Sequence, residues 1–433
     1  MSIDVRSRRQ DESRSLTRDE MLDWLLPTAI SANGELAHRG LRYLDLPNLG
    51  LSVDGTEVTL GLGTGTSGGA SGAMTLLPGI ESAGVVAVLD ADALSNLLQD
   101  VQSTMGLAMN SQVKITEGNI TDWVAWEPVL RALLDGRKVH EEGDVAFSDL
   151  HGRPLDLKRT FTADSDAEEM GNFLDQAGFL HVREVFEEEE MESLGADVDE
   201  WISRATPDDG ESWWATDDSG AQQAVRVLFF YEKSETLRSL VADPRYQVIA
   251  GLTGDGHIHS GNAEGLVKPL GIVRGLSDLP WHKDCGQGMH SYMCNSLTTG
   301  ISVTGADRTS GALGVIPGSH RANTMATGRD RKLDLEPMML ETSRGDVTVH
   351  CSDTLHRAYP PVDRPRKVVY SSFTLPRRGV GEVRFEDVEQ VRGDEDSKRL
   401  ARQQRAALSN VQDRIEAADN EEDAKRYQAG HGR

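Results

Sequence analysis

The sequence has few cysteines, a shortage of basic residues and no long hydrophobic run, and each shortage excludes a class of protein. Three cysteines in 433 residues are too few for a disulfide framework. Lys and Arg number 45 against 70 Asp and Glu, a net charge of −25 that argues against binding to nucleic acid or to an anionic membrane. No run approaches the roughly 18 apolar residues of a membrane helix, and the charged N-terminus lacks a signal segment. We therefore expect a soluble, cytoplasmic protein with no membrane span and no nucleic-acid partner.

Length and composition indicate a globular protein with more than one domain. A hydrophobic fraction of 38% together with 43 glycines is normal for a packed core, and 433 residues suggest two or three domains. The pattern along the chain predicts an α+β domain at 1–140, a polar linker at 141–163, a β-rich domain at 164–385 and a charged helical tail at 386–433.

The first domain mixes strand and helix signals. An Asp-Gly pair at 54–55 predicts a hairpin turn, and the β-branched run Val85–Leu89 predicts a strand followed by a helix that starts at Asp90. A Thr-x-x-Glu pattern at 17–20 predicts a capped short helix, which we expect Pro27 to end. Apolar residues at helical spacing later in this domain indicate a packed core: Trp123, Trp126, Val129, Leu130, Leu133 and Leu134.

Two segments of this domain resemble the sterol-carrier-protein fold: VVAVLDADALSNLLQ at 85–99 and MNSQVKITEGN at 109–119, with a closing helix. The resemblance covers about residues 25–135 and implies a sheet and helices around an apolar cavity. The sequence is compatible with two alternatives: an open ligand cavity, or a core filled by side chains. We expect the domain to serve substrate recruitment or assembly, because it carries no catalytic constellation.

The second domain starts with alternating helix and strand signals. Apolar spacing predicts a helix over 170–177 that ends at Gly178, then a strand within 178–186 and a helix over 191–201. From 224 to about 376 the pattern consists of short β-rich runs broken by Gly, Pro and Asp, which is typical of a barrel or jelly roll.

The residues with the clearest chemistry lie in this β-rich region. His282 and Asp284 are two residues apart, so on an extended strand both side chains point to one face. His356 would join them from a strand that folds back alongside. Two histidines and one carboxylate suit a non-haem Fe(II) oxygenase, because three neighbouring positions on the metal stay open. Arg366, ten residues further, can hold a distal carboxylate in a bidentate manner.

Five ordered elements in this region resemble the phytanoyl-CoA dioxygenase family of Fe(II)/2-oxoglutarate oxygenases. They are VKPLG at 267–271, HKD at 282–284, SGALGVIPGSHRAN at 310–323, the Gly-Asp strand with the distal His at 345–356, and Arg366. The resemblance covers about 165–378 and implies a double-stranded β-helix (jelly roll), with Fe(II), 2-oxoglutarate and O2 as cofactor and cosubstrates. It implies that His282, Asp284 and His356 bind iron, with Arg366 as the 2-oxoglutarate clamp and Lys268 as a further cofactor-binding residue.

Two departures from the family pattern affect the 2-oxoglutarate site. Family members often carry Ser or Thr two residues after the distal histidine, where this chain has Ala358, so Tyr359, Thr299 or another hydroxyl would have to substitute. Arg364 competes with Arg366 for the clamp, and spacing favours Arg366.

Other histidines offer weaker arrangements. His257, His259 and Glu264 fit the first cupin motif by spacing, but the second motif is only approached, and both histidines are expected on the strand that leads to Lys268. His350 has no partner at ligand spacing in the sequence.

These features predict an enzyme that hydroxylates, or otherwise oxidises, a C–H bond of a small hydrophobic, lipid-like molecule, with release of succinate and CO2. Asp284 argues against a halogenase, in which a small residue replaces the carboxylate. The alternative is a lipid-binding or transfer protein whose oxygenase-like domain is inert. Besides the small-molecule substrate, a second copy of the chain in a homo-oligomer is a candidate partner.

Overall fold

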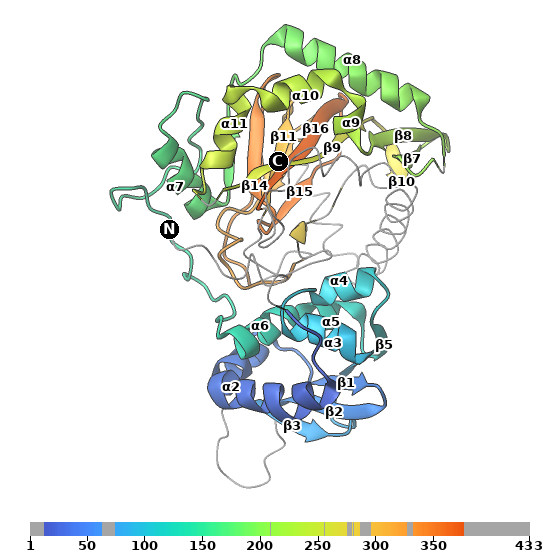
Figure 1. Ribbon diagram of the computed structural model, residues 1–433, viewed down its shortest axis with the longest axis vertical. Coiled ribbons are helices and arrows are strands. Elements are labelled where there is room, and N and C mark those ends of the chain that lie inside the picture. Colours follow the sequence, from blue (N-terminus) through green and yellow to red (C-terminus); the bar gives the residue numbers. More distant parts are fainter. Residues whose placement is uncertain are drawn as a thin grey trace.

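The computed structural model describes residues 13–62, 74–207, 209–254, 256–274, 279, 281–285, 296–326 and 332–375. The predicted helical tail at 386–433 lies outside these residues. The chain forms two units, an N-terminal α+β unit and a larger unit built around two β-sheets, joined by an arm of irregular structure (Figure 1). Among the described residues, none of the helices combines the length and the hydropathy needed to cross a membrane.

The N-terminal unit is a five-stranded mixed sheet with helices packed on it. Its strands lie in the order β3-β2-β1-β4-β5, with β1 and β4 parallel and the other pairs antiparallel. Its elements are the π-helical turn η2 (Glu20–Leu25), α2 (Leu26–Leu44), β1 (Leu49–Val53), β2 (Thr56–Leu62), β3 (Met74–Pro78), β4 (Val85–Leu89), α3 (Ala91–Leu98), α4 (Thr104–Met109), β5 (Lys114–Glu117), α5 (Ile120–Ala125) and α6 (Glu127–Asp135).

Several local predictions for this unit are confirmed. Asp54 and Gly55 both have positive φ, 47° and 84°, and make the tight turn between β1 and β2. Asp90 caps α3 by accepting a hydrogen bond from the Ala93 N–H at 2.8 Å. Local sequence chemistry was sufficient at both places.

The prediction that Pro27 ends the first helix is wrong. The helix continues from Glu20 to Leu44, with Pro27 in the first turn of α2. In the π-helical turn before it, the Leu26 N–H bonds to Met21 O, five residues back. This wider turn accommodates the proline ring, which in a regular helix would clash with the carbonyl four residues earlier.

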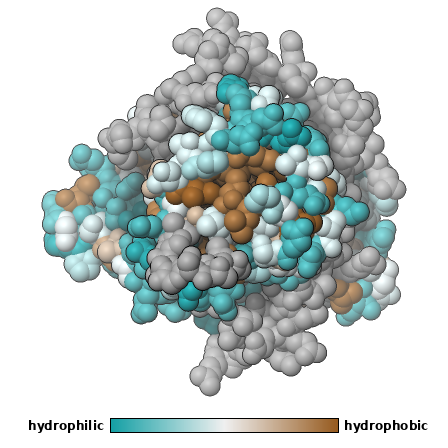
Figure 2. All heavy atoms as spheres, turned by 90° about the horizontal axis from the view of Figure 1, so that it is seen from below, coloured by the Kyte–Doolittle hydropathy of each residue, from teal (hydrophilic) through white to brown (hydrophobic). Residues whose placement is uncertain are grey.

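The two tryptophans of the helical stripe lie inside the core of their own unit. Trp123 and Trp126 are fully buried, and their indole N–H groups donate to Thr104 O at 2.8 Å and Pro47 O at 3.0 Å. Both side chains therefore fill the core and are not available to cover the second unit. At its far end the N-terminal unit exposes a hydrophobic patch surrounded by hydrophilic residues (Figure 2).

The second unit is a pair of sheets of antiparallel strands with helices against the larger one. The eight-stranded sheet has the order β10-β7-β8-β9-β16-β11-β14-β6, and the three-stranded sheet the order β13-β12-β15. The elements are α7 (Ala167–Ala177), β6 (Phe179–Val182), α8 (Glu188–Arg204), β7 (Ser212–Asp217), β8 (Gln222–Val227), α9 (Phe230–Lys233), α10 (Glu235–Ala242), α11 (Pro244–Gly251), β9 (Ile258–Lys268), β10 (Ile272–Arg274), β11 (Ser296–Ile301), β12 (Leu313–Val315), β13 (Met338–Leu340), β14 (Val347–Cys351), β15 (His356–Ala358) and β16 (Arg366–Thr374).

The jelly-roll prediction holds for the sheets, with one correction. The segment from 224 to 376 is not β-rich throughout, because α9, α10 and α11 occupy 230–251. Their apolar residues pack on the side chains of one face of the eight-stranded sheet, such as Val349, Val369 and Phe373. Figure 1 shows α8, α10 and α11 along that sheet. The opposite face is therefore the one left for polar chemistry.

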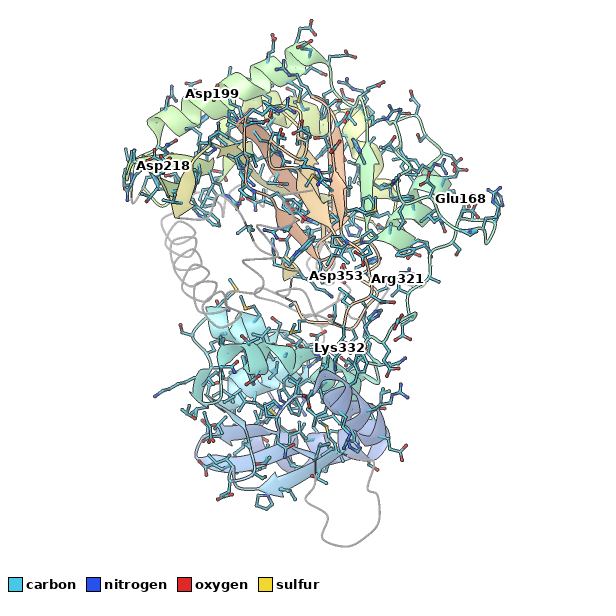
Figure 3. All side chains as sticks on the ribbon, turned by 180° about the vertical axis from the view of Figure 1, so that it is seen from behind. Glu168, Asp199, Asp218, Arg321, Lys332 and Asp353 are labelled. Carbon is cyan, nitrogen blue, oxygen red and sulfur yellow. The ribbon has the colours of Figure 1, made fainter. Side chains whose placement is uncertain are left out.

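The junction between the two units is built from buried polar contacts. The Asn323 side-chain amide donates to Pro128 O and to Arg137 O, both at 2.8 Å, and His140 N–H donates to Asn323 O at 3.0 Å. His140 also bonds Asp334 at 2.6 Å. Figure 3 places the labelled Arg321 and Lys332, from the same stretch of chain, near this junction.

Candidate metal centre

Two histidines and one aspartate meet where the segment around His282 runs beside β15. The His282 N–H donates to His356 O and the His356 N–H donates to His282 O, both at 3.0 Å. This antiparallel bridge brings together two residues far apart in the sequence. Asp284, two residues after His282, lies on the same side of the extended segment.

The three side chains are close enough to share one ion. The Nε2 atoms of His282 and His356 lie 3.3 Å and 3.4 Å from Oδ1 of Asp284. One ligand atom from each residue lies within 4.8 Å of the other two, and this is the one such group found among the described residues. Both histidines are buried, whereas the Asp284 side chain is about one-third exposed.

A backbone contact orients one of the histidines for ligation. His356 Nδ1 lies 2.9 Å from Thr354 O, so this nitrogen carries the proton and donates to the carbonyl. The lone pair is then on Nε2, which faces Asp284. Metal-binding histidines are usually held in this way by a second hydrogen bond.

Asp284 is ionised in this surrounding. Its desolvation raises the pKa, but the neighbouring imidazoles of His356, His282 and His350 outweigh that effect and hold the pKa well below the usual range. The other carboxylate oxygen, Oδ2, accepts a hydrogen bond from Thr298 Oγ1 at 2.9 Å. An ionised carboxylate beside two imidazoles is the donor set that a divalent metal such as Fe(II) requires, with neighbouring positions left open.

His350 lies beside this centre, although its spacing in the sequence indicates no partner. Its Nε2 lies 3.6 Å from Oδ2 of Asp284, and its ring centroid is 4.1 Å from that of His356. It enters from β14, where it pairs directly with Thr298 of β11. Sequence spacing did not reveal it, because the contact depends on the strand register.

Two buried cations lie on the same sheet face as Thr298. Ser372 pairs directly with Thr298, and Arg366 is six residues before it on β16, so the Arg366 side chain points to the same face. Lys268 of β9 is the direct partner of Arg366. Both side chains are 1% exposed.

The Arg366 guanidinium retains unused hydrogen-bonding capacity. Its Nη1 donates to Gly311 O at 2.9 Å, whereas its Nε has no partner, and it has no acidic partner among the described residues. Lys268 Nζ donates to Tyr359 O. A buried guanidinium without a counter-ion fits an anionic ligand such as the distal carboxylate of 2-oxoglutarate.

The structure gives contacts for both residues predicted to supply a helper hydroxyl, Thr299 and Tyr359. The Thr299 hydroxyl bonds the Tyr246 phenol at 2.5 Å on the apolar face of the sheet, opposite Thr298. The Tyr359 ring packs edge-on against Trp281 at 6.5 Å, and Arg357 lies over it at 4.6 Å. The prediction for Thr299 is therefore corrected, because its side chain lies on the opposite sheet face from Thr298 and Arg366, whereas the role of Tyr359 stays a prediction.

The competing arrangements do not assemble around an ion. Arg364 pairs with Asp307, and its side chain is 55% exposed, which leaves Arg366 as the buried arginine. His259 lies on β9, as predicted, and bonds Ser371 at 2.6 Å, whereas Glu264 pairs with Arg226 at 2.8 Å. The cupin reading is therefore wrong for the residues that the structure describes.

Comparison with known proteins agrees with this geometry. The family model of phytanoyl-CoA dioxygenase (PhyH) matches residues 174–367. This stretch of the chain is thus similar to the PhyH family. Iron and 2-oxoglutarate fit this domain and the donor set described above. No curated protein matches the sequence.

Several solved structures are similar to about half of the chain. The α-ketoglutarate-dependent carbocyclase SnoK from nogalamycin biosynthesis is 22% identical, with 52% of this chain and 91% of that chain covered and a TM-score of 0.41. The epimerase SnoN is 19% identical, with 48% and 83% covered and a TM-score of 0.40. EctD from S. alaskensis with bound Fe is 16% identical, with 49% and 78% covered and a TM-score of 0.41.

Proposed function

We propose that this protein is an Fe(II)- and 2-oxoglutarate-dependent oxygenase that hydroxylates a C–H bond of a small molecule and releases succinate and CO2. The observation that carries the proposal is the convergence of His282, Asp284 and His356 on one point, within 4.8 Å of one another. When bound, Fe(II) supplies the O2 chemistry that no side chain can supply.

The residues around the site would have two roles, binding the metal and binding 2-oxoglutarate. His282, Asp284 and His356 would hold the metal and leave three neighbouring positions open. Arg366 would hold the far carboxylate of 2-oxoglutarate and so fix the cosubstrate beside the metal, with Lys268 adding positive charge next to it. Because Asp284 supplies the third protein ligand, no position is set aside for a halide, which favours hydroxylation over halogenation.

The substrate that we propose is a small hydrophobic molecule. The support on the protein is the hydrophobic patch at the end of the N-terminal unit (Figure 2). Mass spectrometry of small molecules that copurify with metal-free protein, prepared without oxygen, tests this proposal. Recovery of a polar metabolite alone would contradict it.

The alternative is a lipid-binding or transfer protein with an inert oxygenase-like domain. Two observations disfavour it: the metal donor set is complete, and Trp123 and Trp126 fill the core of the N-terminal unit. Fe(II) and 2-oxoglutarate added without oxygen distinguish the two functions. A weak visible charge-transfer band is expected for an oxygenase, and its absence together with retained lipid binding would favour the carrier.

The decisive test is turnover by ligand variants. His282→Ala and Asp284→Ala should abolish substrate-stimulated succinate formation, because each removes one of three metal ligands. The matched controls are His151→Ala and Asp363→Ala, which change exposed residues of the same types and should keep wild-type turnover. Normal turnover in either ligand variant would refute the proposal.

A further inference from the structure

His350 is a buried imidazole whose polar atoms are not used by the fold. The residue is 1% exposed, and neither Nδ1 nor Nε2 has a hydrogen-bond partner among the residues that the structure describes. Leaving such a buried polar group unsatisfied destabilises the folded protein. Phenylalanine or leucine would fill the same volume without that cost. The imidazole is therefore better explained by a partner that it gains when the site is loaded.

The position of the ring identifies that partner. The two oxygens of Asp284 face different neighbours: Oδ1 faces His282 and His356, whereas Oδ2 faces Thr298 and His350. Thr298 already donates to Oδ2 at 2.9 Å. His350 Nε2, at 3.6 Å, is just beyond hydrogen-bond distance of the same oxygen. A small rotation of either side chain closes this gap.

We propose that His350 is a positioning residue for Asp284: its Nε2–H donates to Oδ2 in the metal-loaded protein and, with Thr298, leaves only Oδ1 to bind the metal. This inference rests on the proposed function. With two donors on Oδ2, the carboxylate cannot swing to chelate with both oxygens. A monodentate Asp284 keeps open the coordination position that the cosubstrates need.

A direct ligand role for His350 is the main competing explanation. Its Nε2 approaches the carboxylate from the Oδ2 side, whereas the Nε2 atoms of the other two histidines lie beside Oδ1. A positioning residue and a metal ligand differ in which substitutions preserve metal binding. Glutamine keeps an N–H donor and can preserve positioning, whereas a ligand's loss removes the binding itself, as in His282→Ala.

The experiment uses Co(II) as the probe, without 2-oxoglutarate or oxygen, in the full-length protein. We expect His350→Phe to weaken Co(II) binding about 10- to 100-fold in calorimetry, in the range known for residues that orient metal ligands. His350→Gln should stay within a few-fold of wild type. The visible d–d spectrum of bound Co(II) should change in His350→Phe and return toward wild type in His350→Gln, a signature that loss of packing would not produce.

Two results would overturn the inference: wild-type affinity and spectrum in His350→Phe, or complete loss of Co(II) binding in both variants, which would make His350 a ligand. If His350→Phe does not fold, His350→Leu takes its place, and the Thr298→Val His350→Gln double variant reports on the same oxygen. A failure of the proposed function is seen separately, because the wild-type protein would then bind Co(II) but give no charge-transfer band with Fe(II) and 2-oxoglutarate.

Discussion

Thr298 and Thr299 are neighbours on β11, yet their hydroxyl groups serve opposite faces of the eight-stranded sheet. Thr298 donates to Asp284 Oδ2 at 2.9 Å, whereas Thr299 meets the phenol of Tyr246 at 2.5 Å. Burial raises the pKa of Tyr246 above its usual value, so the phenol stays protonated. One hydroxyl thus belongs to the metal centre and the other to the core.

This relationship gives a prediction with an internal control. Thr298→Val should weaken metal binding several-fold with little change in stability, because Asp284 loses a donor. Thr299→Val should cost about 1 kcal/mol of unfolding free energy, the typical net value of a buried hydrogen bond, and leave metal affinity unchanged. Calorimetric titration with Co(II) and urea unfolding measure the two effects. If Thr299→Val weakened metal binding and Thr298→Val lowered stability instead, the two residues would not lie on the sheet faces described here.

Arg366 should determine the affinity for 2-oxoglutarate. Arg366→Lys keeps one positive charge but loses the planar pair of donors, so we expect the Kd for 2-oxoglutarate to rise about 10- to 100-fold while Co(II) affinity is unchanged. Arg364→Lys is the control, since Arg364 is exposed and paired with Asp307. A larger rise in the Kd for 2-oxoglutarate in Arg364→Lys than in Arg366→Lys would show that Arg364 is the clamp and would contradict this prediction.

The Gly-Asp pair before β14 has a structural explanation. Gly345 has φ +83°, and a Cβ there would lie 2.1 Å from Phe186 O. The Asp346 carboxylate accepts from Glu184 N–H at 3.0 Å, Ser343 N–H at 2.8 Å and His181 Nε2 at 2.8 Å. The pair therefore anchors the start of the strand that carries His350.

Asp346 makes stability depend on pH in a defined direction. Burial raises its pKa, but the hydrogen bonds from His181 and the two backbone groups outweigh it, so the pKa lies below its usual value. The stabilisation is present above about pH 3.9, the value in the unfolded chain, and is lost as pH falls through the folded-state pKa. Asp346→Asn should cost about 1–3 kcal/mol at pH 7.

The difference between wild type and Asp346→Asn should shrink in acid. Urea unfolding at pH 7 and near pH 3 measures it, with the exposed Asp363→Asn as control. If the difference in unfolding free energy between wild type and Asp346→Asn grew as pH fell, it would contradict the direction predicted for Asp346.

Local chemistry in the sequence was enough for the hairpin at 54–55, the Asp90 cap and the pairing of His282 with Asp284 on one face, since each depends on neighbouring residues. His356 and Arg366 followed from ordered motifs. Long-range register could not be read in the same way. Thr298 and His350 reach Asp284 only because β11 pairs with β14 in one particular register. The helices at 230–251 were missed because their short apolar runs look the same as those of strands.

The last prediction concerns the coupling between the two units. Lys283, between two metal ligands, bonds through its N–H to Ala326 O at 2.7 Å. The same segment carries Asn323, which is 5% exposed and donates to Pro128 O and Arg137 O of the N-terminal side. The N-terminal unit therefore supports the segment on which the metal centre rests, and its deletion should affect more than recruitment.

Asn323→Ala tests this coupling without removing a domain. It leaves two carbonyls without their donor, so we expect a loss of about 1–3 kcal/mol in unfolding free energy and weaker Co(II) binding. The control is Asn262→Ala, which changes an exposed residue of β9 and should alter neither the unfolding free energy nor Co(II) binding. In scanning calorimetry, both units of the wild-type protein should unfold in one cooperative transition. Two separate transitions, with Co(II) affinity unchanged in Asn323→Ala, would show that the metal centre is independent of the N-terminal unit.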